Sequence, residues 1–147
     1  MDQFMKHISR IHRGANRWRE AMLNEEELNG IQQVYLFHIC RHPGISQEQL
    51  RAKILVNKSN VARQLSSLEK MGYVKRHVSQ ADKRLYEVFP TDRAMLIYPK
   101  IVYLMEEWNE RLLEDLNPQE REMFIGVLTK ISHKAKQFSK KGENEDE

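Results

Sequence analysis

At 147 residues, with 40% hydrophobic and 31% charged residues and a net charge of +3, the chain is typical of one globular domain, with or without helical extensions. Its one cysteine, Cys40, excludes an intrachain disulfide, and no apolar run approaches the ~18 residues of a membrane span, so we expect a cytoplasmic protein without a membrane anchor. Glycine-rich phosphate loops, nucleophile elbows, HExxH and CxxC motifs are also missing from the sequence, so we expect neither an enzyme nor a protein with a cofactor or metal.

The first two predicted helices differ in the pattern of their apolar residues. An amphipathic first helix is predicted by a stripe at spacings of three and four, formed by Phe4, Ile8, Ile11, Ala15, Trp18 and Met22. A stripe of this kind favours packing against another helix. The second helix is expected over residues 26–41, with the acidic residues 25–27 at its start. It is apolar on most sides, so we expect it to be buried, and the sequence HPG at residues 42–44 ends it.

Two shorter helices are predicted to follow in close succession. Ser46, with Gln49 three residues later, forms a capping-box pattern that predicts a short helix to about residue 53. Asn57 is a favourable N-cap for the next helix, which Gly72 ends after about residue 71. This helix has an apolar face and a roughly opposite polar face, formed respectively by Val61, Leu65 and Leu68 and by Ser59, Arg63, Ser66, Ser67 and Lys70.

A basic hairpin is predicted next. Residues 73–78 and 85–89 are strand-like, and they flank a polar tip that holds Asp82, Lys83 and Arg84. Residues 51–84 carry nine Lys and Arg against two acidic residues, and positive charge of this density attracts a polyanion. The predicted order is a short helix, a tight connection, a second helix with a polar outer face and a basic hairpin. This is the order of a winged helix-turn-helix. The second helix of such a unit approaches base edges in the major groove.

Two long helices are expected after the hairpin. One starts at Thr91 and Asp92, and Pro99 is expected to bend or interrupt it. The other follows Asn117 and Pro118. The apolar stripes of the two helices are formed by Ile97, Ile101, Leu104, Trp108 and Leu112, and by Phe124, Leu128, Ile131, Ala135 and Phe138. The acidic tail, residues 142–147, is too polar to pack and is expected to be disordered.

Two stretches of the central segment form a pattern of several motifs in a fixed order. They are KSNVARQLSSLEKMGYVKR, residues 58–76, and ADKRLYEVFPTDRA, residues 81–94. The pattern consists of a helix ending in L-E-K-x-G, a strand with a terminal arginine and a wing with D-x-R. It is formed here by Leu68, Glu69, Lys70, Gly72, Arg76, Asp82 and Arg84. In this pattern the chain resembles the MarR family of winged-helix transcription regulators, over residues 26–94. It departs from the family pattern at Arg51, Leu55, Pro90 and Ala94.

The resemblance implies a mainly α fold with a small β-hairpin. Residues 26–90 would form the winged helix-turn-helix, and residues 1–25 and 91–141 would form a helical dimerisation region. The implied function is that of a homodimeric, sequence-specific regulator that binds a pseudo-palindromic operator in double-stranded DNA, a repressor that a small-molecule effector releases. The operator, the regulated genes, the effector and the direction of regulation are left open by the sequence.

The resemblance also implies the DNA contacts. The recognition helix would supply Lys58, Ser59, Asn60, Arg63, Ser66, Ser67 and Lys70. The wing would supply Lys75, Arg76, Asp82, Lys83 and Arg84, with Asp82 bracing Arg84 against the backbone or minor groove. The same basic patch would also suit an RNA-binding protein or a helical protein-interaction module. Only Tyr73 and Tyr86 lie nearby for base stacking, which favours duplex DNA.

Three further features are candidates for sensing. Trp18, Tyr35 and Trp108 could line an effector pocket, although aromatic residues at helical spacing more often belong to the core. Cys40 lies in an apolar run, where cysteine usually acts as a small hydrophobic residue rather than a redox sensor. His38 and His42 lie four residues apart and could share a metal, but no carboxylate or thiolate is expected on the same face, so we expect ordinary core or helix-end histidines.

Overall fold

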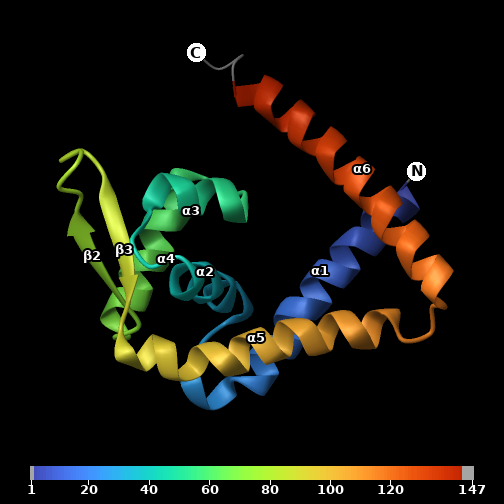
Figure 1. Cartoon of the computed structure of the whole chain (residues 1–147), viewed down its shortest axis with the longest axis horizontal. Coiled ribbons are helices and arrows are strands. Elements are labelled where there is room, and N and C mark those ends of the chain that lie inside the picture. The colour runs from blue at the N-terminus through green and yellow to red at the C-terminus, as the bar shows by residue number, and fades with distance from the viewer. Residues whose placement is uncertain (1, 144–147) are drawn as a thin grey trace. The chain divides into compact units, whose positions relative to one another are not determined.

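The computed structural model describes residues 2–143, with side chains described for residues 3–139. The elements are α1 (Asp2–Met22), the 3-10 helix η1 (Asn24–Glu26), α2 (Gly30–Arg41), β1 (Ile45–Ser46), α3 (Gln47–Ile54), α4 (Lys58–Lys70), β2 (Val74–Val78), β3 (Tyr86–Pro90), α5 (Asp92–Leu113) and α6 (Pro118–Glu143) (Figure 1). The chain divides into two compact units, Met1–Trp108 and Asn109–Glu147. No helix in the described part is long and apolar enough to cross a bilayer.

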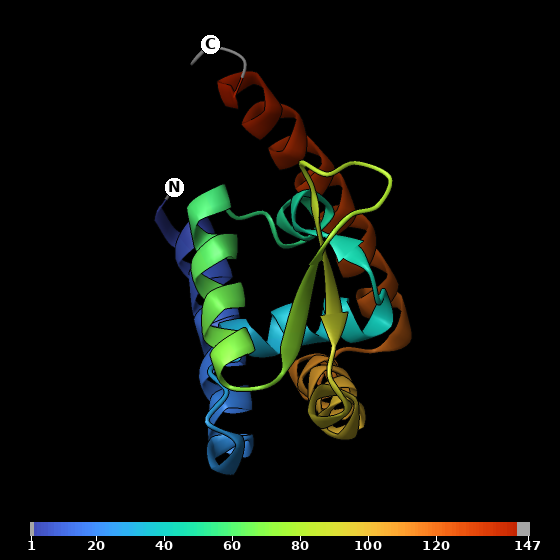
Figure 2. The same cartoon turned by 90° about the vertical axis from the view of Figure 1, so that its left-hand side faces the viewer.

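The sheet has three strands rather than the two predicted. Its order is β1–β3–β2, and both pairings are antiparallel. β2 and β3 pair from Val74 opposite Pro90 to Val78 opposite Tyr86, and the loop that joins them extends beyond the strands (Figure 2). β1 has only two residues, too few for an alternating pattern to be detected in the sequence. The mainly helical winged-helix fold is confirmed, and the hairpin gains a third strand.

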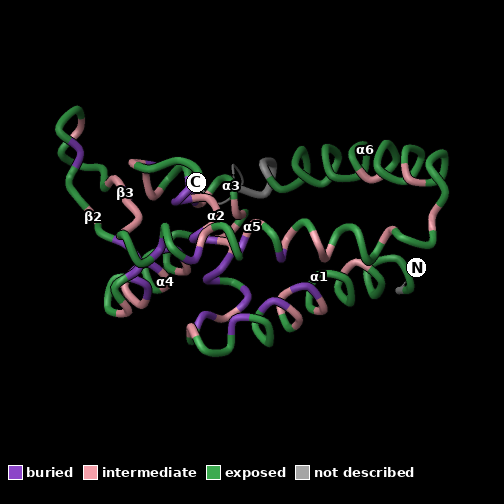
Figure 3. Tube along the Cα trace, turned by 60° about the horizontal axis from the view of Figure 1, so that its bottom comes forward, coloured by how far each residue is buried: buried purple, intermediate pink, exposed green. Residues whose placement is uncertain are grey.

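α2 is the most buried helix of the first unit (Figure 3). Tyr35, Leu36 and Ile39 are fully buried and pack in one cluster with Leu50 of α3 and Leu65 of α4. Full burial of a Leu or Ile side chain contributes about 1.5–3 kcal/mol. The core therefore joins the helix-turn-helix to α2, as the nearly continuous apolar sequence of α2 predicted.

The predicted start of α2 was wrong by four residues. The helix begins at Gly30, and Asn29 and Gln32 form a capping box at its N-terminus. Glu25 and Glu26 lie in η1 instead of the first turn of α2. An asparagine that can accept a hydrogen bond from the N3 amide is a stronger start signal than nearby acids. Gly30 also lies against α1, where an added Cβ would be 2.6 Å from the backbone of Asn16.

The two helices of the helix-turn-helix start and stop close to the predicted residues. Ser46 and Gln49 form the predicted capping box of α3, and Asn57 accepts a hydrogen bond from the Asn60 amide at 2.8 Å to start α4. α4 ends before Gly72, which has a φ of +82°. α3 ends at Leu55, which adopts a left-handed conformation with a φ of +60°.

The two predicted C-terminal helices, α5 and α6, are both present. α5 continues through Pro99, so the proline does not interrupt the helix, and Ile97 and Ile101 on either side of it are buried in the core. In the second unit, α6 exposes its apolar residues; Phe124 and Phe138 are examples, at 41% and 63% exposure. Residues 142 and 143 of the expected disordered tail are helical, and residues 144–147 lie outside the described part.

Candidate nucleic-acid interface

The outer face of α4 is polar and basic. Ser59, Arg63 and Lys70 are exposed, as their positions opposite the apolar face predicted, and Lys58 at the start of the helix is exposed as well. The first turn of α4 contains no acidic residue, so the positive end of the helix dipole is not neutralised by a carboxylate of its own turn. A helix N-terminus with free amides and a lysine favours a phosphate group. The N-terminal half of α4 can therefore hold a polyanion close to its exposed side chains.

Three other predicted residues of α4 are only partly exposed, and each is hydrogen bonded within the protein. Asn60 accepts a hydrogen bond from the hydroxyl of Tyr35 at 2.6 Å. Ser67 accepts one from the Gln32 amide at 3.1 Å, and Ser66 accepts a longer one, 3.5 Å, from Arg76. α2 thus holds α4 at two points, two helical turns apart. These anchors were not predicted, because a Tyr or Gln in a helix carries no signal of its partner.

The wing tip, residues 79–85, is held in shape by its own hydrogen bonds. Leu85 donates its backbone N–H to the carbonyl of Asp82 at 3.0 Å, and Ser79 donates to the carbonyl of Leu85 at 2.8 Å. Asp82 receives the Nε of Arg84 at 3.1 Å and its terminal nitrogen at 3.2 Å. The hydrogen bond from the Arg84 side chain, and then that from its backbone, hold the pKa of Asp82 below its usual value. The arginine side chain is still 89% exposed, so the carboxylate orients it without covering it.

Lys75 and Lys83 are exposed, whereas Arg76 is paired. The Nε of Arg76 lies 3.0 Å from an oxygen of Glu69, the acidic residue near the end of α4. Arg76 thus connects β2 to α4, and it has less freedom to reach a ligand than Lys75 or Lys83. An ion pair of this exposure contributes about 0–1 kcal/mol to stability. Its effect is mainly to fix β2 against α4.

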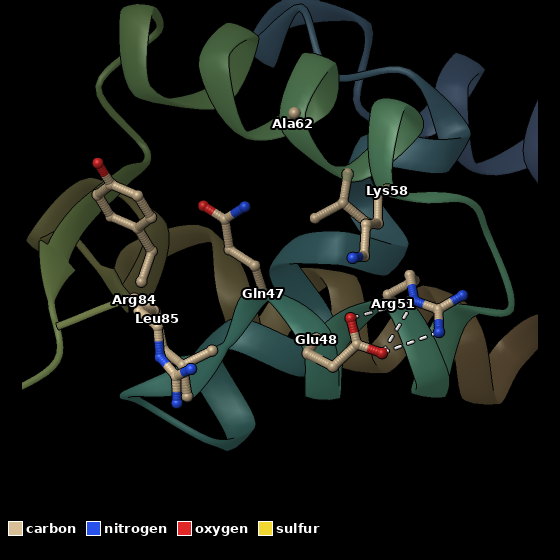
Figure 4. Close-up of a pocket in the computed structure, with 9 residues that line it drawn as sticks. Gln47, Glu48, Arg51, Lys58, Ala62, Arg84 and Leu85 are labelled. Carbon is tan, nitrogen blue, oxygen red and sulfur yellow. Dashed lines mark hydrogen bonds and ion pairs between the residues drawn. The ribbon is translucent and has the colours of Figure 1, made fainter. Parts of the chain in front are cut away.

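A cavity of about 300 Å³ lies between α3, the start of α4 and the wing (Figure 4). It is lined by Gln47, Glu48, Arg51, Lys58, Val61, Ala62, Arg84, Leu85 and Tyr86. Three of these residues are cations and one is a carboxylate. Arg51, which departs from the family pattern, donates to Glu48 at 2.8 Å and is half-buried. The cavity shows that Lys58 of α4 and Arg84 of the wing face one space, a proximity that chain order alone did not give.

The candidate sensing residues are placed differently from one another. Trp18 and Trp108 lie against each other, with ring centroids 5.7 Å apart, but neither they nor Tyr35 lines the cavity between α3, α4 and the wing. Burial raises the pKa of the Cys40 thiol to about 11, which disfavours the reactive thiolate. Burial, followed by the charges of Lys53, His42 and Arg41, lowers the pKa of His38. Among the described residues no group of three His, Cys, Asp or Glu could hold a metal ion.

Comparison with known proteins shows that the chain is similar to transcription regulators of one family. Residues 27–85 match the model of the MarR family. The chain is 26% identical to YybA, an uncharacterised helix-turn-helix-type transcriptional regulator of Bacillus subtilis, over 99% of both chains. A MarR protein structure from Peptoclostridium difficile has a TM-score of 0.87 at 25% identity, over 91% of this chain and 88% of that one. A putative MarR family regulator from Listeria monocytogenes, solved with a 26mer DNA, has a TM-score of 0.82 at 26% identity, over 88% and 87% of the two chains.

The match covers the elements that carry the basic surface. Residues 27–85 include α2, α3, α4, β2 and the whole wing tip. The structural likeness extends over about nine-tenths of the chain, so it includes helices outside the matched segment. The L-E-K-x-G and D-x-R residues lie where the winged helix requires them, at the end of α4 and on the wing tip. In sequence over residues 27–85, and in fold over about nine-tenths of its length, the chain is similar to the MarR family.

Proposed function

We propose that this protein is a sequence-specific regulator of transcription that binds double-stranded DNA as a homodimer. α4 would enter the major groove and the wing would lie along the backbone or the adjacent minor groove. The curated relatives are transcriptional regulators, and the structure of the Listeria relative was solved with DNA. The DNA contacts would be made by the exposed residues of α4 and the wing, foremost Arg63 and Arg84.

The cavity between α4 and the wing is the observation that carries this proposal. It places Lys58 and Arg84 on one concave surface, together with the N-terminus of α4. A duplex presents one phosphate charge per ~1.7 Å of its axis, so a basic surface of this kind suits its backbone. The exposed side chains of Ser59 and Arg63 lie on the same helix and would meet base edges while the cations hold the phosphates.

The proposal is tested by two arginine substitutions that separate reading from positioning. An arginine that contacts guanine bidentately contributes about 1–3 kcal/mol of discrimination, so Arg63→Ala should weaken binding to the selected operator far more than binding to scrambled duplex. Arg84→Ala should weaken both duplexes alike, and should lower the slope of log K against log salt by about one per subunit if one phosphate contact is lost. Fluorescence anisotropy on both duplexes at several salt concentrations measures both effects.

A matched control removes one positive charge elsewhere. Lys100→Ala on the exposed side of α5 should leave affinity and salt slope within about twofold of the parent protein, because a distant charge is screened at physiological salt. A single-stranded RNA probe tests the RNA-binding alternative. If RNA is bound more tightly than the operator, or if Arg63→Ala keeps the parent ratio of operator to scrambled binding, the assignment of α4 as the reading helix is refuted.

The dimer is the second part of the proposal. Apolar residues of α1 and α6 are exposed in the single chain, including Phe4 at 49%, Ile11 at 43% and Ile131 at 40%. Exposed apolar stripes at helical spacing favour a two-fold helical interface. Ile131→Glu should shift the mass measured by light scattering at micromolar concentration from dimer to monomer, and operator affinity should fall with it. A monomeric parent protein would refute the dimer and the expected half-site spacing of about 10 bp.

We also propose that the protein represses transcription and that a small molecule releases it from DNA. An anionic effector bound between Lys58 and Arg84 would occupy the cations that we assign to DNA, so the two ligands would compete. A promoter reporter in cells with and without the protein distinguishes repression from activation. Competition binding with small carboxylates tests the release.

A further inference from the structure

The side chain of Asn60 is oriented by a residue outside α4. The hydroxyl of Tyr35, on α2, lies 2.6 Å from Oδ1 of Asn60. Tyr35 is fully buried, while Asn60 is partly exposed in the first turn of α4. Arg63, one turn later, is exposed on the same helix. A buried side chain thus reaches the part of α4 that we assign to base reading.

The hydrogen bond fixes which end of the Asn60 amide is available. If the amide were flipped, its NH₂ group would donate to the Tyr35 oxygen, and the buried hydroxyl proton would have no acceptor. A buried donor without a partner costs about 1–3 kcal/mol, so the arrangement with Oδ1 toward the hydroxyl is favoured. Burial raises the pKa of Tyr35 to about 12, so the phenol keeps its proton at physiological pH.

The nitrogen of the same amide is left for a ligand. Within the described residues, the Asn60 side chain has no hydrogen bond other than the one it accepts from Tyr35, while its backbone N–H donates to Asn57. A free asparagine can pair bidentately with adenine, because it offers one donor and one acceptor. An asparagine whose oxygen already accepts one hydrogen bond keeps both N–H donors and a single lone pair whose direction the first bond fixes, so it is better suited to donate than to accept.

We propose that Tyr35 sets base specificity by committing Asn60 to act as a donor. At the base that Asn60 meets, the protein would prefer an edge made of acceptors, foremost guanine with N7 and O6, over adenine, whose N6 amino group is a donor. Arg63 has donors and no acceptor, so the two neighbouring positions would share this preference. This inference rests on the proposed function, in which α4 reads duplex DNA, and it adds Tyr35 as a positioning residue that does not touch the DNA.

Selection of bound sequences from a random duplex pool tests the inference. Parent protein, Asn60→Ala and Tyr35→Phe are each used for a selection at the same salt concentration. Asn60→Ala identifies the position that Asn60 reads, because the preference is lost there. Tyr35→Phe should relax that same position toward adenine and leave the others unchanged. Where the parent discriminates about fivefold or more against adenine, the variant should discriminate about twofold or less.

Two further variants make the result independent of folding defects. Asn60→Asp keeps an acceptor for Tyr35 but has no donor to offer, so the preference at the same position should move toward cytosine, whose N4 amino group is a donor. Tyr103→Phe removes a hydroxyl from an exposed tyrosine of α5 and should leave every position unchanged. Circular dichroism and thermal unfolding establish that each variant is folded before its selection.

The outcomes separate this inference from the proposed function. If the parent protein enriches no motif, the proposed function fails and the inference fails with it. If the parent has a motif and Tyr35→Phe reproduces it at every position, only the inference fails. If Tyr35→Phe does not fold, Asn60→Asp decides alone: an unchanged preference for guanine overturns the inference, and a change to cytosine supports it.

Discussion

Leu55, in the turn of the helix-turn-helix, gives a stability prediction that depends on a single backbone conformation. Its φ is +60° and its ψ is +52°, a left-handed conformation that costs an ordinary L-residue about 1–2 kcal/mol. The side chain is 79% exposed, so its burial contributes little to the stability of the protein. Glycine adopts this conformation without strain, but it loses about 0.5–1 kcal/mol more conformational entropy on folding than alanine.

The comparison of Leu55→Gly with Leu55→Ala isolates the strain. Both variants lose the exposed side chain, and only glycine relieves the left-handed backbone. The mid-range strain of about 1.5 kcal/mol less the mid-range entropy cost of about 0.75 kcal/mol predicts that the glycine variant is more stable than the alanine variant by about 0.75 kcal/mol. At an exposed position with an ordinary helical backbone the order is reversed, because glycine is then less stable than alanine by about 1 kcal/mol.

Urea unfolding at a fixed protein concentration measures this difference. A change in the midpoint at constant m-value reports a change in stability, and a fixed concentration keeps any contribution from self-association equal among the variants. Ala62, exposed within α4, provides the internal control: Ala62→Gly should destabilise the protein by about 1 kcal/mol. If Leu55→Ala is as stable as Leu55→Gly or more stable, the turn is not strained and the reasoning is refuted.

Three other predictions concern packing, reactivity and the wing. Gly30→Ala should destabilise the protein by about 1–3 kcal/mol in the same assay, because the new Cβ would lie 2.6 Å from the Asn16 backbone; an unchanged midpoint would contradict the close packing of α1 on α2. Cys40, whose thiol has a pKa of about 11, should react with iodoacetamide far more slowly at pH 8 than a free thiol does, as mass spectrometry would show, and fast labelling of the folded protein would contradict its burial. The Asp82 carboxylate has a lowered pKa. Any stability from its contact with Arg84 is therefore present above the ordinary pKa of 3.8 and is lost as the pH falls through the lowered value. A carboxyl ¹³C titration of Asp82 with a midpoint at or above 3.8 would disprove the contact with Arg84.

The sequence by itself determined the order and type of most elements, because their signals are local. A cap such as Asn57 and a stop such as Gly72 act on neighbouring backbone groups, so α4 was placed to within one or two residues. The apolar positions Val61, Leu65 and Leu68 fixed its buried face by periodicity alone. The D-x-R motif likewise predicted a contact between residues two apart, and the structure contains it.

Tertiary structure decided what depends on residues far apart in the chain. The two-residue strand β1 exists only because β3 offers it a partner, so no local pattern could reveal it. The hydrogen bond from Tyr35 to Asn60 spans 25 residues, and that from Gln32 to Ser67 spans 35. Helical position had placed Ser67 on the polar face of α4, and the family resemblance had named Asn60 as a DNA contact. The packing of α2 against α4 decided which lone pairs and N–H groups remain for a ligand, because a lone pair that accepts a hydrogen bond from the core is no longer available at the surface.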